Sequence, residues 1–197
     1  MSKINTFSRS FLVEQLKCIE NLCKQENQIE KIINLLIKKR NSGKNIFIIG
    51  NGGSASTASH FASDLLKTSI TKKNKRFKAI ALVDNLPVIL AWANDTSYDD
   101  IFVEQLKNHS SKGDVVIAIS GSGKSSNVVK ALKFAKKNGV ICIGLTGKHG
   151  GYFPKLCDTC CRVPSNDMLT IESTHVIICH CIVNTIRNLG QPVFQYE

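Results

Sequence analysis

The sequence predicts an α/β fold in which helices cover both faces of a parallel sheet of about five strands. Short apolar runs without polar alternation, such as "NIFIIG" at 45–50 and "DVVIAIS" at 114–120, are typical of parallel strands buried on both faces. Longer stretches with apolar residues at helical spacing separate these runs. With 197 residues the chain is long enough for one buried core, so we expect a single domain over residues 1–197.

The N-terminal segment 1–43 predicts two helices ahead of the sheet. Its apolar residues recur at helical spacing in two blocks, and Ser42-Gly43 supplies the glycine that commonly follows a helix. We expect a helical hairpin with more apolar surface than one face of a sheet can cover, and therefore a role in oligomerisation. The apolar positions are Phe7, Phe11, Leu12, Leu16, Ile19, Leu22, Ile29, Ile32, Ile33 and Leu36.

Five apolar runs predict the strands in chain order. They are "NIFIIG", "KAIALV", "DVVIAIS", "VICIGLT" and, more weakly, "CCRVP". A long helix from about Thr170 to Leu189 follows the last run. The expected architecture is a doubly wound sandwich, in which ligands bind beyond the carboxyl ends of the strands.

Charge and hydropathy narrow the class of partner. Lysine and arginine total 26 against 15 acidic residues, a net charge of +11 that favours anionic partners. The basic residues are spread along the chain, apart from "KKNKRFK" at 72–78, which is typical of a solvated loop. We expect phosphorylated metabolites rather than nucleic acid. No apolar run reaches the roughly 18 residues that span a bilayer, and the N-terminus lacks the apolar core of a signal peptide, which predicts a cytoplasmic protein without membrane contact.

Eight cysteines are scattered along the chain, several of them inside apolar segments. In a cytoplasmic protein such cysteines are typically small buried hydrophobes rather than disulfide partners. The cluster "CDTCC" at 157–161 contains a C-x-x-C, but no second ligand pair lies near it in the sequence. We therefore expect no structural zinc site there.

Two Gly/Ser loops follow predicted strands and precede predicted helices. The first begins with Gly50-Asn51-Gly52-Gly53-Ser54, and the second is "SGSGKSSN" at 120–127. Backbone amides at a helix N-terminus favour anions, and the hydroxyls of Ser120, Ser122 and Ser125 can converge on the same group. The second loop therefore predicts a phosphate site, and the pair of loops predicts a ligand bound from both sides.

Nucleotide binding is the competing interpretation of the second loop. Gly123-Lys124-Ser125 matches the end of a P-loop, but Ala118 occupies the position of its leading glycine. "AIALVD", which ends at Asp84, would have to serve as the magnesium-holding strand. A dinucleotide site is weaker still, because neither loop has the G-x-G-x-x-G spacing.

Several blocks together resemble one family, the sugar isomerase (SIS) domains and in particular the phosphoheptose isomerases. They are "GNGGSASTASHFASDL", "AWANDTSYDDIF", "GDVVIAISGSGKSSNVVKAL", "GLTGKHGG" and "ESTHVIICH", and the resemblance covers nearly the whole chain. It implies a SIS-type three-layer sandwich with a five-stranded parallel sheet. It also implies a cytoplasmic homotetramer with active sites between subunits and one zinc ion per subunit.

The implied activity is that of an aldose–ketose isomerase, an intramolecular oxidoreductase. It would convert sedoheptulose 7-phosphate to D-glycero-D-manno-heptose 7-phosphate through an enediol, for lipopolysaccharide, capsule or S-layer heptose. The alternative is a non-catalytic SIS-domain tetramer that binds a phosphosugar or a regulatory protein. The acidic residue at position 64 and the histidine at position 180 favour the isomerase over this non-catalytic alternative.

The resemblance assigns the metal and acid/base residues. The family's His-x-x-x-Glu block is His60 to Asp64 here, and its Gln and His are Glu172 and His180. The implied metal ligands are these four residues, and Asp64 and His180 are the implied catalytic pair. Both departures from the family pattern, Glu to Asp at position 64 and Gln to Glu at position 172, affect implied metal ligands. The carboxylate added at position 172 favours binding of a divalent cation. Because eight residues of helix rise about 12 Å, Glu172 must lie at an irregular helix start or the ligands must come from different subunits.

The resemblance also implies how substrate is bound. The serine loop would hold the phosphate, the first loop the sugar, and residues 94 and 95 its hydroxyls. The implied substrate-binding residues are Asn51, Gly52, Gly53, Ser54, Asp64, Asn94, Asp95, Ser120, Gly121, Ser122, Ser125 and Glu172.

Overall fold

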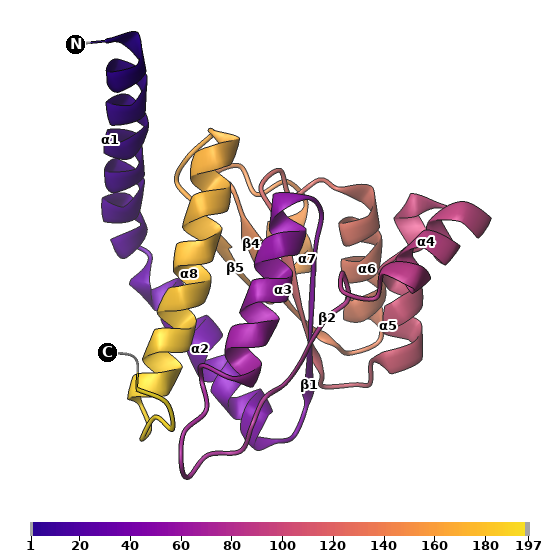
Figure 1. Ribbon diagram of the computed structural model, residues 1–197. Coiled ribbons are helices and arrows are strands. Elements are labelled where there is room, and N and C mark those ends of the chain that lie inside the picture. Colours follow the sequence, from indigo (N-terminus) through magenta and orange to yellow (C-terminus); the bar gives the residue numbers. More distant parts are fainter. Residues whose placement is uncertain (1, 196–197) are drawn as a thin grey trace.

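The computed structural model describes residues 2–195 and contains one five-stranded parallel sheet between two layers of helices (Figure 1). The strand order is β2-β1-β3-β4-β5, and every neighbouring pair is parallel. The predicted α/β sandwich is confirmed. The strands are β1 (Asn45–Gly50), β2 (Lys78–Ala81), β3 (Val115–Ser120), β4 (Ile141–Thr146) and β5 (Thr159–Arg162).

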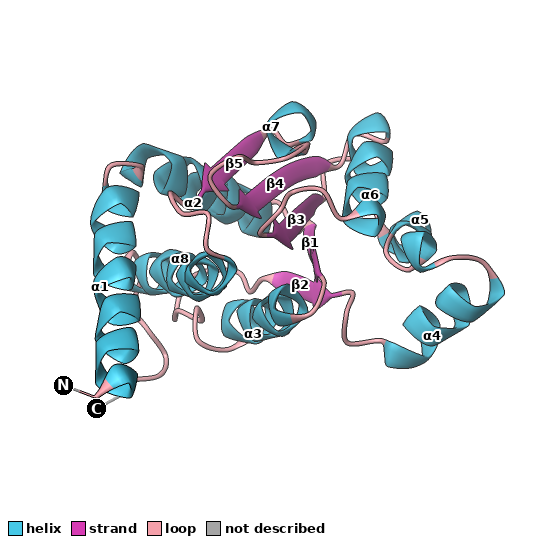
Figure 2. Ribbon diagram, turned by 90° about the horizontal axis from the view of Figure 1, so that it is seen from above, coloured by secondary structure: helices cyan, strands magenta, loops and turns pink. Residues whose placement is uncertain are grey.

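The helices divide between the two faces of the sheet, as Figure 2 shows from above. One face is covered by α2 (Glu26–Asn41), α3 (Gly53–Leu66) and α8 (Met168–Asn188), with α1 (Lys3–Cys23) outside α8. The other face carries α6 (Ser126–Lys137) and α7 (Phe153–Leu156), with α5 (Val103–His109) beside α6. A short 3₁₀ helix, η1 (Tyr98–Asp100), joins α4 (Leu86–Asp95) to this second layer.

Burial on both faces of the sheet explains why the sequence of β1 lacks polar alternation. Along β1, Ile46 and Ile48 belong to the core under α3 and α8, whereas Phe47 and Ile49 belong to the core under α6. Every residue of β3 is likewise buried. Because both faces of these central strands are dry, their successive side chains are apolar. The edge strand β2 differs, since Lys78 and Ile80 are exposed and only Ala79 and Ala81 are buried.

The two N-terminal helices are present, and both contact α8. Helix α1 begins after Ser2, whose side chain accepts a hydrogen bond from the Asn5 amide, and α2 is followed by Gly43 with φ of 67°. Only Cys18 and Leu22 of α1 are buried, while Ile4 and Phe7 are 79% and 72% exposed. Oligomerisation through segment 1–43 stays a prediction that this apolar surface supports.

Helix α4 was not assigned from the sequence. It begins at Leu86 with Pro87 in its first turn, and it buries none of its residues although it is apolar. Leu86 and Leu90 are each 58% exposed. The helix therefore presents an uncovered apolar surface in the single chain.

Helix α8 is long and apolar enough to cross a membrane by length and composition alone. Half of that apolar window is buried inside the molecule, and the helix contacts α1, α2, α3 and β4. These are the contacts of a core helix. The eight cysteines are all free thiols, and Cys18, Cys142, Cys161 and Cys179 are buried. Cys157 and Cys160 are half-buried and Cys23 and Cys181 are exposed, so burial holds for half of the cysteines, whereas the sequence predicted it for most of them.

The imidazole of His175 lies in the core on α8, fully buried. Within residues 2–195, no hydrogen bond of normal geometry reaches either ring nitrogen, although the nearby Thr146 backbone favours the charged form. Desolvation dominates and lowers the pKa of His175 from 6.5 to about 4. The side chain is therefore neutral in the folded protein at pH 7.

This burial predicts an acid-sensitive fold. Between pH 6.5 and about 4 the unfolded chain binds a proton at His175 that the folded chain does not, so the free energy of unfolding falls as pH falls, by about 3 kcal/mol in all. Denaturant unfolding at pH 7, 5.5 and 4.5 measures the slope. The variant His175→Leu should lose this part of it, and an identical slope in both proteins would contradict the assignment.

Candidate functional site

The serine loop at the end of β3 gathers its hydroxyls around one point. The Ser120 oxygen lies 3.4 Å from the hydroxyl oxygens of both Ser122 and Ser125. Ser125 precedes the first residue of α6, yet its side chain makes no capping hydrogen bond and its hydroxyl faces the loop instead. Hydroxyls and the amides of a helix N-terminus therefore meet at this position, an arrangement suited to a phosphate.

The loop that follows β1 forms the opposite wall of the same pocket. The cavity has a volume of about 130 Å³ and is lined by Asn51, Ser54, Ile119, Ser120, Gly121, Ser122, Ser125, Met168 and Glu172. The two Gly/Ser loops thus face one ligand position. Gly52, with φ of 54°, turns the chain into α3.

Glu172 reaches into this pocket from α8 and lies against the start of α3. Its Cδ atom is 2.9 Å from the point that a Cβ on Gly53 would occupy, so only glycine leaves room for the carboxylate there. The N-terminus of α3 carries a partial positive charge that favours the carboxylate. The departure from Gln to Glu therefore adds a negative charge beside the serine loop.

Two asparagines tie the loops together, and sequence reasoning found only one of them. The side chains of Asn51 and Asn127 exchange hydrogen bonds of 2.9 and 3.0 Å. The hydroxyl of Tyr98 donates a third, of 3.2 Å, to Asn51 Oδ1. Asn127 is buried in the first turn of α6. An amide side chain next to the apolar residues of this helix could have indicated from the sequence that it has a polar partner.

A second group of side chains lies between α3 and α8, which run side by side (Figure 1). The Nε2 atoms of His60 and His180 are 3.5 Å apart, and Asp64 Oδ2 lies 3.6 and 3.7 Å from them. Ligands at the corners of a tetrahedron with bonds of about 2.0–2.1 Å are roughly 3.3 Å apart, so this triangle is close to three corners of a zinc-type site.

The group is open on one side. The two imidazoles are 52% and 53% exposed, whereas Asp64 is 16% exposed. Among the described residues 2–195, no other set of three His, Cys, Asp or Glu ligands converges in this way. Two imidazoles and a carboxylate suit a divalent ion with a free fourth position.

The four ligands implied by the resemblance do not all meet within one chain. His60, Asp64 and His180 do, but Glu172 is not part of the group and instead lines the serine pocket. Helix α8 is continuous from Met168, so Glu172 does not lie at an irregular helix start. If Glu172 also binds the metal ion, it must reach it from another copy of the chain.

Asn94 and Asp95 lie at the end of α4, apart from the serine pocket. Both are exposed, and the Asn94 amide donates a 2.9 Å hydrogen bond to Asp95 Oδ1. Neither lines the cavity between the two loops. Their contact with sugar hydroxyls stays a prediction, which requires a rearrangement or a second copy.

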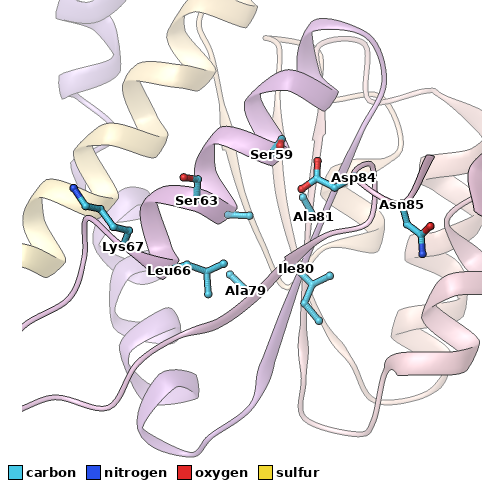
Figure 3. Close-up of a pocket in the computed structure, with 10 residues that line it drawn as sticks. Ser59, Ser63, Leu66, Lys67, Ala79, Ile80, Ala81, Asp84 and Asn85 are labelled. Atoms are coloured by element: carbon cyan, nitrogen blue, oxygen red, sulfur yellow. The ribbon is translucent and has the colours of Figure 1, made fainter. Parts of the chain in front are cut away.

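The residues needed for nucleotide binding are not brought together. Asp84 is exposed and lines a different hollow, of about 680 Å³, between α3 and the edge strand β2 (Figure 3). Lys124 is exposed beside the serine loop, and its backbone amide donates to Ser122 Oγ. This arrangement gives no support to the magnesium-dependent interpretation.

The C-x-x-C is a packing feature. The sulfurs of Cys157 and Cys160 both lie close to Gly144, at 2.9 and 3.2 Å from where its Cβ would be. Burial raises the pKa of Cys160 to about 11, and burial also raises the pKa of Cys157. Such thiols remain protonated at neutral pH, which disfavours them as metal ligands.

Several known proteins are similar to this chain in sequence and in fold. The family model described as SIS domain matches residues 10–147. A phosphoheptose isomerase of Aliarcobacter butzleri is 37% identical over 180 residues, which cover 91% of this chain and 95% of that protein. Phosphoheptose isomerase 1 of Campylobacter jejuni is 40% identical over 161 residues, or 82% and 86% of the two chains. The solved structure of a phosphoheptose isomerase from Neisseria gonorrhoeae has a TM-score of 0.88 at 26% identity and covers 94% of this chain and 100% of that one.

The triangle of ligand atoms predicts a metal-binding defect in one variant. Replacing His180 by alanine removes one of three converging donors, so the affinity for Zn²⁺ should fall by more than about tenfold. Competition with a chelating dye measures it. The matched control is His109→Ala, an exposed histidine at the end of α5. Equal Zn²⁺ affinity in the two variants would remove the metal assignment.

Proposed function

We propose, because the chain belongs to the phosphoheptose isomerases of the SIS-domain family, that it interconverts sedoheptulose 7-phosphate and D-glycero-D-manno-heptose 7-phosphate. The observation that carries the proposal is the presence in one chain of the serine pocket and the His60–Asp64–His180 group. The first suits the phosphate and the second suits acid/base chemistry at the other end of a sugar.

The reaction moves one proton between neighbouring carbons. A base removes a proton from C1 of the ketose, an enediol forms, and protonation of C2 gives the aldose. We assign the acid/base roles to Asp64 and His180, whose Oδ2 and Nε2 atoms lie 3.7 Å apart. The same atoms would hold a zinc ion, so the acid/base role and the ligand role belong to different states of the site. Both groups face an open position, so a substrate carbon and its hydroxyl can approach them together.

The assigned cofactor is zinc, one ion per subunit, held by His60, Asp64 and His180. When bound, zinc would polarise the carbonyl and hydroxyl oxygens of the sugar. Glu172 completes the implied ligand set only across a subunit boundary, and in its own chain we assign it to substrate binding with Asn51, Gly52, Gly53 and Ser54.

A homotetramer with sites between subunits would account for three exposed apolar surfaces. The first is on α1, and the second is on α4, which buries nothing. The third lies at the open edge of the sheet, where Leu66 and Ile80 line the hollow of Figure 3 and are 46% and 44% exposed. Apolar surfaces of this kind mark contacts between chains.

The state of the cysteines and the proposed product indicate the cellular compartment and the pathway. We place the protein in the cytoplasm, because its eight described cysteines are free thiols, as in reducing compartments. The product would enter heptose synthesis for lipopolysaccharide, capsule or S-layer glycan. The alternative is a non-catalytic protein that binds a phosphosugar or a regulatory protein. This alternative does not account for the open His60–Asp64–His180 group.

The serine pocket gives a prediction about substrate binding. The double variant Ser122→Ala, Ser125→Ala removes two hydroxyl donors to a charged group, and KM for sedoheptulose 7-phosphate should rise by about 100-fold with a smaller change in kcat. Steady-state kinetics measures both. Ser110→Ala, whose hydroxyl bonds only to the Leu106 carbonyl, is the control. Unchanged KM in the double variant would move the phosphate elsewhere.

A further prediction concerns assembly. Light scattering at micromolar concentration should give a mass of about four chains. Charged replacements at two exposed positions of α1, Phe7→Glu and Leu12→Glu, should lower that mass without unfolding the chain, because neither side chain is buried in the core. A monomeric wild-type protein would contradict the tetramer.

A further inference from the structure

The two oxygens of Asp64 have different partners. Oδ2 faces the Nε2 atoms of His60 and His180, at 3.6 and 3.7 Å. Oδ1 accepts a hydrogen bond of 2.9 Å from the hydroxyl of Thr68, one helical turn further along the chain. Only one oxygen of this carboxylate therefore points at the position between the imidazoles.

Thr68 is held in place by the turn that ends α3. The amides of Lys67 and Ser69 donate to the carbonyls of Ser63 and Asp64, each at 2.9 Å, and the Ser69 hydroxyl donates to the Leu65 carbonyl at 2.8 Å. The turn thus closes back on the last residues of the helix.

The chain beyond this turn is fastened to the C-terminal segment. The Val193 amide donates to the Ile70 carbonyl at 3.1 Å, and the Lys72 amide donates to the Gln191 carbonyl at 2.9 Å. Thr71 and Pro192 form the bridge between these hydrogen bonds. The backbone on both sides of Thr68 is therefore held by hydrogen bonds, and the Thr68 hydroxyl itself is held by its bond to Asp64.

We propose that Thr68 is a positioning residue for the metal ion, acting through Asp64. This inference rests on the metal site proposed above. The hydroxyl holds Oδ1, so that Asp64 presents Oδ2 alone and binds the ion through one oxygen. Groups that bond to a metal ligand from behind orient it and raise the affinity of the site.

The length of the side chain explains why this chain needs such a support. Aspartate is one methylene shorter than the glutamate of the family pattern, so its carboxylate has less reach toward the imidazoles on α3 and α8. With Oδ1 unbonded, the carboxylate could turn about the Cβ–Cγ bond to angles at which neither oxygen faces both imidazoles, and the triangle of ligand atoms would exist for only part of the time.

The test compares Zn²⁺ affinity in three variants, measured by competition with a chelating dye on metal-stripped protein. Thr68→Val keeps the shape and removes the hydroxyl, and should weaken Zn²⁺ binding by about tenfold. Thr68→Ser keeps the hydroxyl and should bind Zn²⁺ as the wild type does. Thr185→Val is the matched control on α8, because its hydroxyl donates to the Cys181 carbonyl and not to a ligand. Thermal unfolding of each apo protein checks that it is folded.

Two outcomes overturn the inference and leave the proposed function standing. Wild-type affinity in Thr68→Val would show that the hydrogen bond does not position Asp64. A loss in Thr68→Ser as large as that in Thr68→Val would show that affinity does not follow the hydroxyl, because serine keeps it. A wild-type protein that does not bind Zn²⁺ would remove the metal site itself, and the role of Thr68 with it.

Discussion

The arrangement of the molecule depends on the parallel pairing of β1 with β3. Gly50 and Ile119 are register partners at the carboxyl ends of these strands, so the loops that follow them leave the sheet side by side. The chain then continues into α3 on one face and α6 on the other. At this reversal of strand order a parallel sheet opens a crevice, and here both walls of the crevice are Gly/Ser loops. Two stretches separated by about seventy residues thereby form one pocket.

Helices α3 and α8 connect the pocket to the His60–Asp64–His180 group. Helix α3 begins at the pocket and carries His60 and Asp64 further along, while α8 carries Glu172 beside the pocket and His180 beside Asp64. The packing of these two helices therefore fixes the separation between the serine pocket and the His60–Asp64–His180 group. Substitutions at their contact would alter both sites together, because neither helix can shift without moving a residue of each.

Much of this was predictable from local pattern. Apolar runs predicted all five strands, and the signal is clearest for β1, β3 and β4, which are buried on both faces. It is weaker for the edge strands β2 and β5, which expose part of their residues. Serine density singled out the loop that forms the serine pocket. Three features were not. Helix α4 was missed because it buries nothing in the single chain, and Thr68 reads as an ordinary helix-end residue. Asn127 was missed because its hydrogen-bond partner, Asn51, lies on the loop after β1, far away in the sequence. Each depends on tertiary or subunit contacts that a local pattern does not encode.

The central claim is that the pocket and the His60–Asp64–His180 group act on one phosphosugar as an isomerase. The most direct measurement is incubation of the protein with sedoheptulose 7-phosphate in deuterated water, followed by NMR of the sugar carbons. The account predicts the aldose 7-phosphate with deuterium at C2, because the enediol takes up a proton from solvent-exchanged groups. Substrate that remains unconverted and unlabelled, although it binds to the protein, would contradict the account and leave a phosphosugar-binding protein without this chemistry.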